Sequence, residues 1–260
     1  MAYEAIIVER NEGVVTITMN RPERKNAANA AMWNELRDAF ESVAVAAGDR
    51  VVVLTGAEGN FCSGADVSGD SEGTERPHQL FQMDHIGDVA TALKRIPVPV
   101  VAKIRGVAVG AGLNMALLCD MSVASDNARF SEIFAKRGLT IDFGGSWILP
   151  RRVGLHRAKE LALLADIIDA TEADRIGLVN RVVPDGELDA FVDDWARRLA
   201  AGPPIALAQT KRLLNASATS SLEEALDGEG FAQTINFTTQ DTTEAMLAFR
   251  DKRDPKFQGR

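Results

Sequence analysis

The sequence predicts an α/β protein in which a mixed core of strands and helices precedes a helical tail. Apolar strand-like runs alternate with helix-like segments as far as about residue 156, and beyond that point the pattern is mainly helical. The 260 residues, 46% hydrophobic and 25% charged, suffice for one large domain or one domain with an appendage. We expect a core over residues 1–195 and a C-terminal helical region over residues 196–260.

The first half of the chain contains the signals for a hairpin, buried strands and amphipathic helices. Alternating apolar residues predict a hairpin of Tyr3–Arg10 and Val14–Met19. Apolar residues at spacings of three and four predict a helix from Met32 to Ala44, with Gly48 as its stop signal. Further expected strands are Val51–Thr55, Val100–Ile104 and Met121–Ser125, and further helices are 79–95 and Leu113–Cys119. Residues 68–77 are polar and rich in Ser, Gly and acidic side chains, which predicts a mobile surface loop.

The second half is predicted to be helical apart from one short strand near Val179–Val183. Helical spacing of apolar residues continues to the end of the chain. The helices expected are 156–165, 172–177, 186–201, 203–215, 221–238 and 240–250.

The charge balance and the apolar runs exclude several classes of protein. The chain has 29 Lys and Arg against 37 Asp and Glu, a formal net charge of −8, which disfavours a nucleic-acid partner. The N-terminal sequence MAYEAIIVER has no basic region, so we expect no signal peptide. The longest charge-free run, Gly106–Cys119, is too short to span a bilayer. Cys62 and Cys119 suit a reducing compartment and lack metal-ligand spacing. We therefore expect a cytoplasmic protein with no metal and no membrane partner.

Two segments of small residues are candidates for binding a ligand oxygen through the backbone. Cys62–Asp66 follows an apolar strand, and its small side chains leave the N–H groups accessible; a tight turn is the alternative interpretation. Gly106–Asn114 places two glycines before a helix whose N-terminus carries unpaired N–H donors and a positive partial charge. A glycine-rich packing turn explains the second segment equally well.

Asp142 is the candidate general base. It lies between Ile141 and Phe143 and close to Trp147, and burial among apolar side chains raises the pKa of a carboxyl group. The alternative is an aspartate that caps the following helix. His78, His85 and His156 are dispersed, and we expect each to be structural or at the surface.

Taken in order, six segments of the chain resemble the enoyl-CoA hydratase/isomerase (crotonase) superfamily. The resemblance covers nearly the whole chain, and six matches in register are specific where each alone is weak. The matching segments are Asn20–Ala27, Ser63–Asp66, Gly106–Asp120, Gly138–Arg151, Gly177–Val179 and Ala248–Phe257.

The resemblance implies a spiral of ββα turns whose C-terminal helices form a homotrimer, which often pairs into a hexamer. It implies an acyl-CoA thioester as substrate, with coenzyme A as part of that substrate and no separate cofactor. The N–H groups of Ala65 and Ala111 would hold the thioester oxygen. Phosphate contacts are expected from Arg24, Lys25, Lys252 and Lys256, and further substrate contacts from Ala27, Ser63, Gly64, Asp66, Gly112, Asn114, Phe134 and Trp147.

The reaction implied depends on where the chain departs from the family pattern. Hydratases of the family use two glutamates, and their positions are occupied here by Asn114 and Phe134. Glu132, two residues from Phe134, is not expected to substitute for the missing carboxylate. Asp142 remains, in a setting that resembles the phenylacetate-pathway ring-epoxide isomerases and the Δ3,Δ2-enoyl-CoA isomerases, in which one aspartate moves a proton.

An enoyl-CoA isomerase is therefore the leading hypothesis. Phe134 and Trp147 would form an apolar wall that excludes water. A specialised hydratase is the first alternative, with Asp142 activating a water that Asn114 positions. An aryl-CoA dehalogenase comes next, although Phe134 stands near the position of its tryptophan and His85 is out of register for its histidine. A non-catalytic acyl-CoA-binding protein is the last alternative.

Overall fold

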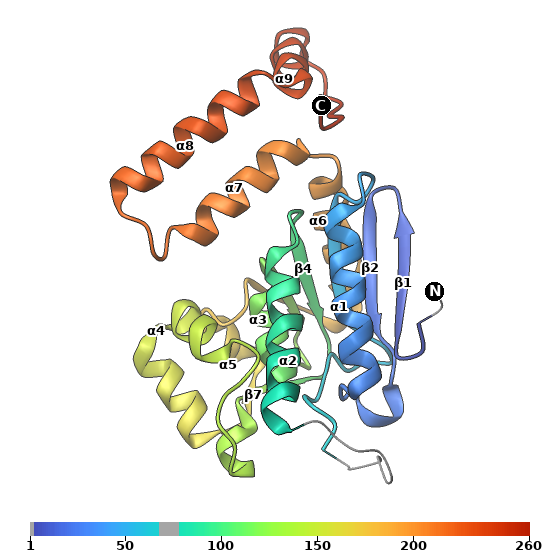
Figure 1. The fold of residues 1–260 in the computed structure, drawn as a ribbon. Coiled ribbons are helices and arrows are strands. Elements are labelled where there is room, and N and C mark those ends of the chain that lie inside the picture. Colours follow the sequence, from blue (N-terminus) through green and yellow to red (C-terminus); the bar gives the residue numbers. More distant parts are fainter. Residues whose placement is uncertain (1–2, 68–77) are drawn as a thin grey trace.

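A computed structural model describes residues 3–67 and 78–260 and contains a six-stranded sheet with helices on both faces (Figure 1). The strand order is β1-β2-β3-β4-β6-β9, and all neighbouring pairs are parallel except the β1–β2 hairpin. The predicted loop 68–77 lies outside the described residues. The strands are β1 Ile6–Asn11, β2 Val14–Met19, β3 Val51–Gly56, β4 Val100–Ile104, β6 Met121–Ser125 and β9 Arg181–Val183.

The sheet is covered on both faces, which explains why β3 begins with four consecutive buried apolar residues. Val52 and Leu54 of β3 belong to the main core, where they pack beneath the helices α1 (Ala30–Val45), α2 (Gln79–Arg95) and α3 (Ala111–Leu118). Val51 and Val53 point the other way, into a second apolar cluster with α6 (Leu188–Ala200). Figure 1 shows α1 and α2 in front of the sheet and α6 behind it.

A second sheet of three very short strands lies beside the first, in the order β5-β7-β8. These strands are β5 Val107–Val109, β7 Arg129–Ser131 and β8 Ile168–Asp169. The sequence analysis missed them because two or three residues are too few to establish an alternating pattern. This sheet positions the glycine-rich segment before α3, since β5 ends where that segment turns into the helix.

The remaining elements agree with the expected ones to within a few residues. The chief difference is α4 (Gly145–Leu164), which begins well before the predicted 156 and contains a break at Gly154, where φ is 75°. The helix expected to stop at Gly48 ends at Val45. The other helices are α5 Ala170–Arg175, α7 Pro204–Ala216, α8 Leu222–Phe237 and α9 Gln240–Asp251, with 3-10 turns η1 Pro22–Arg24, η2 Ile133–Arg137 and η3 Asp185–Glu187.

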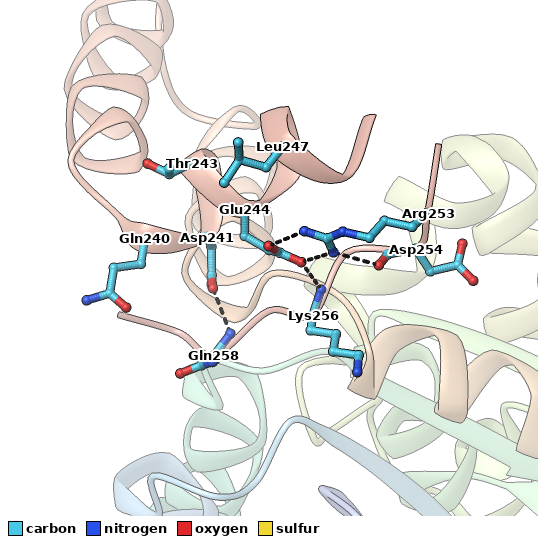
Figure 2. A pocket seen from close by; sticks show the side chains of 9 residues that line it. All are labelled: Gln240, Asp241, Thr243, Glu244, Leu247, Arg253, Asp254, Lys256 and Gln258. Carbon is cyan, nitrogen blue, oxygen red and sulfur yellow. Dashed lines mark hydrogen bonds and ion pairs between the residues drawn. The ribbon is translucent and has the colours of Figure 1, made fainter. Parts of the chain in front are cut away.

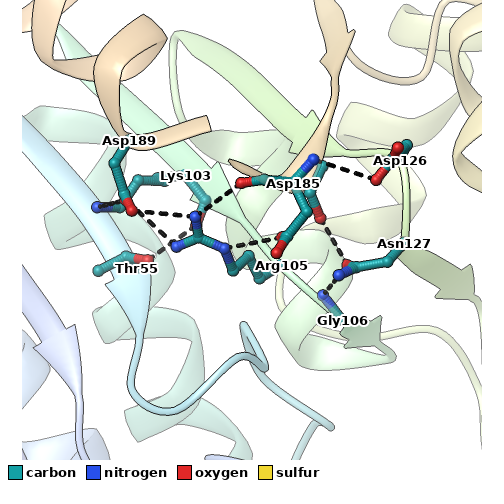
Figure 3. Close-up of polar contacts among 9 residues, drawn as sticks. Thr55, Lys103, Arg105, Gly106, Asp126, Asn127, Asp185 and Asp189 are labelled. Carbon is teal, nitrogen blue, oxygen red and sulfur yellow. Dashed lines mark hydrogen bonds and ion pairs between the residues drawn. The ribbon is translucent and has the colours of Figure 1, made fainter. Parts of the chain in front are cut away.

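A polar cluster fastens α6 to the sheet at the end of β4 (Figure 3). The Arg105 guanidinium donates to Asp185 at 2.9 Å and to Asp189 at 3.0 Å, and Lys103 pairs with Asp189 at 2.8 Å. Hydrogen bonds from Arg105 and Lys103 lower the pKa of Asp189 to about 2. These ion pairs hold the end of β4 in place, and with it the start of the segment that leads to α3.

The helices α7, α8 and α9 extend away from the core (Figure 1). Lys211 of α7 joins them to it, because its ammonium group pairs with Asp120 at 2.6 Å and donates to the Val98 carbonyl. The boundary expected between the core and the C-terminal helical region, at residues 195 and 196, lies within α6. In the described part of the chain, every helix is too short or too polar to cross a bilayer.

Candidate active site

The Cys62–Asp66 segment lies against β5 and the start of α3. The Cys62 N–H donates to the Val107 carbonyl, and the Val109 N–H donates to the Cys62 carbonyl, both at 3.0 Å. A Cβ added to Gly112 would lie 2.4 Å from the Cys62 carbonyl oxygen, so only glycine permits this approach. Two stretches of backbone, singled out separately in the sequence, are thus in direct contact.

This contact brings Gly64, the residue before Ala65, close to the start of α3. Gly64 has φ 100°, and a Cβ on it would lie 3.0 Å from the Val109 carbonyl oxygen and 3.8 Å from the Ala111 nitrogen. Ala111 is the first residue of α3, where helix N–H groups have no intrahelical partner, and Gly110 provides no side-chain cap. Among the described turn and loop hydrogen bonds, neither Ala65 nor Ala111 donates its N–H to a carbonyl. Both N–H groups are therefore candidates for binding a ligand oxygen.

The turn after β2 supports this backbone from the other side. The buried Asn26 side chain accepts the Arg21 N–H and donates to the Ala57 and Asn60 carbonyls. Arg21 also donates to the Ala27 carbonyl and pairs with Asp66 at 2.8 Å. Asp66 and Ala27, expected as substrate contacts, are therefore bound into the scaffold.

Ser63 is tied to the same turn through its backbone and its hydroxyl. Its N–H donates to the Lys25 carbonyl at 3.1 Å, and its hydroxyl donates to the Arg24 carbonyl at 3.2 Å. Arg21 and Asn26 were not singled out as site residues, although both belong to the segment that carries the family resemblance.

Asp142 lies in a tight loop between η2 and α4. Phe143 and Gly144 both have positive φ, at 49° and 75°, and Phe143 is buried against Trp33 with ring centroids 5.5 Å apart. The residue that precedes α4 is Gly144, and no side chain caps this helix, so the capping interpretation of Asp142 is wrong. Asp142 is partly buried, and its Oδ1 has no hydrogen-bond partner among the described residues. Burial raises the pKa of the Asp142 carboxyl to about 6.

Asn114 joins the Asp142 loop to α3. Its side-chain nitrogen donates to the Asp142 backbone carbonyl at 3.0 Å and to Glu132 Oε2 at 3.4 Å. Gly145 fits closely over this amide, because a Cβ there would lie 2.3 Å from Asn114 Nδ2. Asn114 is fully buried, so its amide acts here as a link between the Asp142 loop and Glu132.

Glu132, which the sequence did not lead us to expect as a substitute for the missing carboxylate, lies close to Asn114 and Asp142. The structure places it directly after β7, with 1% of its surface exposed and its carboxylate on the Asn114 amide. Burial, and to a lesser extent the charge of Asp142, raise its pKa to about 8, against the lowering effect of the Asn114 hydrogen bond. The available signal was an acidic residue between Phe130 and Phe134, the same kind of pattern that identified Asp142.

The two aromatic residues expected to exclude water have different surroundings. Phe134 is buried beside the glycine turn, where a Cβ on Gly110 would lie 3.6 Å from its Cζ. Trp147 is 37% exposed and has the Arg151 guanidinium 4.2 Å and the Lys94 ammonium 5.8 Å from its ring centroid.

The four expected phosphate contacts form two separate pairs. Arg24 and Lys25 are exposed on the turn after β2, whereas Lys252 and Lys256 follow α9 at the opposite end of the sheet (Figure 1). Lys256 lines a cavity of about 900 Å³, in which Glu244 pairs with Arg253 at 2.6 Å and accepts the Lys256 N–H (Figure 2). One chain does not bring the two pairs together.

The described residues contain no metal-ligand cluster, and one of the three histidines has a buried nitrogen without a partner among them. No group of three His, Cys, Asp or Glu side chains there could hold a metal ion. His85 of α2 has a buried Nε2 without a hydrogen-bond partner among the described residues.

Comparisons with known proteins agree on one family. Residues 9–260 match the family described as enoyl-CoA hydratase/isomerase. The chain is 39% identical over 260 residues to a probable enoyl-CoA hydratase of Rhodobacter capsulatus, with 100% of both sequences covered. It is 35% identical over 260 residues to the 1,2-epoxyphenylacetyl-CoA isomerase of Escherichia coli, with 99% of each covered. The crystal structure of an enoyl-CoA hydratase from Bacillus anthracis matches with a TM-score of 0.93 at 32% identity, covering 99% of this chain and 100% of that one. These similarities confirm the fold that the sequence resemblance implies.

The close approach at Gly112 can be tested by substitution. Gly112→Ala should lower the free energy of unfolding by about 1–3 kcal/mol, because the added methyl group displaces the Cys62 backbone. Gly87→Ala in α2 is the control; a Cβ there meets nothing within 4 Å, so helix propensity should raise stability by up to about 1 kcal/mol. Denaturant unfolding measures both. Equal stability of the two variants would contradict the predicted crowding.

Proposed function

The chain belongs to the enoyl-CoA hydratase/isomerase family, and we propose that it isomerises the double bond of an enoyl-CoA thioester with Asp142 as its one acid–base residue. The observation that carries the proposal is the state of the Asp142 carboxyl. It is partly buried, caps no helix and has its pKa raised to about 6. Such a group is a base near neutral pH and a competent acid once it has taken a proton.

The proton shift needs one base and one place for the developing negative charge. Ionised Asp142 removes a proton from C2 of a 3-enoyl thioester, and the electron pair moves onto the thioester oxygen as a dienolate. The N–H groups of Ala65 and Ala111 hold that oxygen, at the point where charge develops. Protonated Asp142 then returns the proton to C4, which leaves the conjugated 2-enoyl thioester with no net change in atoms.

Two neighbouring residues support Asp142 as the one acid–base residue, because neither has a group that can transfer a proton. Phe134 offers no proton-transfer group, and Asn114 cannot take a proton from water. Asn114 instead holds the loop of Asp142 through its backbone carbonyl. A non-catalytic binding protein is disfavoured, because keeping a carboxylate in a partly buried site without use is costly.

Hydration of a 2-enoyl thioester is the second candidate, and one observation favours it. Glu132 is a further carboxylate within electrostatic reach of Asp142, and hydration of a double bond uses two acid–base groups. In that reaction Asp142 activates a water molecule positioned by Asn114.

We further propose that coenzyme A is bound across two copies of the chain. Arg24 and Lys25 lie on the turn that supports the site, whereas Lys252 and Lys256 lie at the far end of the same chain. A neighbouring copy in a trimer, or a hexamer of two trimers, supplies the second pair. The exposed apolar side chains of the C-terminal helices support such an assembly; they include Leu214, Leu222, Leu226, Phe231, Ile235, Phe237, Met246 and Phe249.

Asp142→Asn tests the proposed reaction. The variant should lower kcat for 3-enoyl-CoA isomerisation about 1,000-fold, because the amide cannot accept the C2 proton. Its affinity for a saturated acyl-CoA, measured by calorimetry, should stay within about threefold. Asp166→Asn is the matched control, since Asp166 pairs with Lys136 at the surface and should leave kcat unchanged. Undiminished turnover in Asp142→Asn would remove this residue from the mechanism.

The assembly is tested at α8. Phe231 is 75% exposed in the single chain, and we expect Phe231→Arg to convert a trimer into monomers because a charge would be buried between copies. Sedimentation equilibrium measures the change. Glu229→Arg, also on α8 and exposed, is a control for added charge. A wild-type protein that is monomeric at micromolar concentration would contradict the proposal.

A further inference from the structure

Glu132 is the buried ionisable group of the site that the proposed reaction does not use. Its Oε2 accepts the Asn114 side-chain N–H, and the same nitrogen donates to the Asp142 backbone carbonyl. Both N–H bonds of the Asn114 amide are therefore engaged, one with Glu132 and one with the loop that carries the base. Glu132 is connected to Asp142 through a single amide group.

Three buried oxygens at this junction have no hydrogen-bond partner among the described residues: Asn114 Oδ1, Glu132 Oε1 and Asp142 Oδ1. All three are acceptors when both carboxyl groups are ionised, and a buried acceptor without a donor is unfavourable. A proton on Glu132 converts one acceptor into a donor and removes one of two nearby negative charges. The arrangement therefore fits a neutral Glu132.

We propose that Glu132 is a positioning residue, which orients the Asn114 amide and, as a neutral acid, leaves Asp142 as the one negative charge that faces the acyl group. This inference rests on the proposed isomerase function. It assigns Glu132 no contact with the substrate, in keeping with its burial, and no transfer of its own proton.

The charges around Glu132 support the neutral form. Burial and the charge of Asp142 both favour protonation, with the pKa raised to about 8. Charged groups on the neighbouring elements have other partners or are exposed. Among the basic groups, Arg129 and Arg152 donate to backbone carbonyls, Lys136 pairs with Asp166, Arg151 and Lys94 lie over Trp147, and Arg137 is exposed. The acidic Asp169 caps α5. The helix that carries Asn114 has no charged side chain.

A neutral Glu132 matters because the reaction creates an anion. The dienolate forms while Asp142 is losing its charge to the transferred proton, so the pocket holds one negative charge throughout. An ionised Glu132 would add a second charge in a poorly solvated site and disfavour the dienolate. Loss of the Glu132 proton should therefore lower activity on the alkaline side.

The first test is the pH profile of kcat/KM for wild type and Glu132→Gln. Glutamine mimics the neutral acid, since it keeps an oxygen for Asn114 and adds an N–H donor. The wild-type profile should rise as Asp142 ionises near pH 6 and fall as Glu132 ionises near pH 8. Glu132→Gln should match wild type within about threefold at pH 7 and lack the fall, so that it is about tenfold more active than wild type at pH 9.

A second variant tests the hydrogen bond rather than the charge. Glu132→Met keeps the length of the side chain but offers Asn114 no comparable acceptor. It should lower kcat about tenfold with KM within about threefold, because the loop of the base is less well fixed. Unchanged kcat in this folded variant would overturn the positioning role.

The final test does not depend on activity. Between the pKa of an unfolded glutamate and about 8, native Glu132 holds a proton that the unfolded chain has released, so wild-type stability should fall as pH rises. The unfolding constant of wild type relative to Glu132→Gln should increase about tenfold per pH unit across that range, at fixed protein concentration.

The activity and stability measurements separate the possible failures. A wild type without isomerase activity, but with the expected stability difference, would overturn the proposed function and leave the protonation of Glu132 standing. Parallel stability curves, or an alkaline fall that persists in Glu132→Gln, would overturn the inference alone. A folded Glu132→Gln that is inactive at pH 7 would also overturn it, because Glu132 would then transfer a proton itself.

Discussion

The close approach of Gly112 to the Cys62 carbonyl is the constraint on which the site depends. It requires a residue without a Cβ, and it fixes the Cys62–Asp66 segment against the first turn of α3. The same packing brings Gly64, next to Ala65, close to the Ala111 nitrogen. Asn114 lies two residues beyond Gly112, so the same contact determines where the amide meets the Asp142 loop.

The proposed chemistry arises from the different surroundings of two carboxyl groups. Asp142 is partly buried and has a pKa of about 6, whereas Glu132 is almost fully buried and has a pKa of about 8. Groups whose pKa values are pushed apart can hold different protonation states at one pH. In the proposed mechanism this gives, near neutrality, one base and one neutral neighbour, separated by the Asn114 amide.

Much of the core fold was predictable because its strands and helices are long and strongly patterned. The limits of β4 and β6 agree with the predicted strands residue by residue, and α2 spans the predicted 79–95. The strands β5, β7 and β8 were not predictable, since each is stabilised by its partners and too short to show a pattern. The early start of α4 was missed because glycines and Pro150 conceal the helical spacing.

The site was predictable in part. Asp142 was identified by its apolar neighbours, and the two glycine-rich segments by their small residues, which are local signals. The role proposed for Glu132 depends on its contact with Asn114, 18 residues away. The separation of Lys252 and Lys256 from Arg24 depends on where α9 lies. Such facts arise from tertiary structure, and a local pattern does not contain them.

Product analysis with two isomeric substrates tests the central claim most directly. The purified protein is incubated separately with a trans-3-enoyl-CoA and a trans-2-enoyl-CoA of the same chain length, and the products are resolved by chromatography and mass. A single-aspartate isomerase converts the 3-enoyl into the 2-enoyl thioester without a change in mass. Gain of one water by the 2-enoyl thioester, with no isomerisation of the 3-enoyl one, would contradict the account and establish a hydratase.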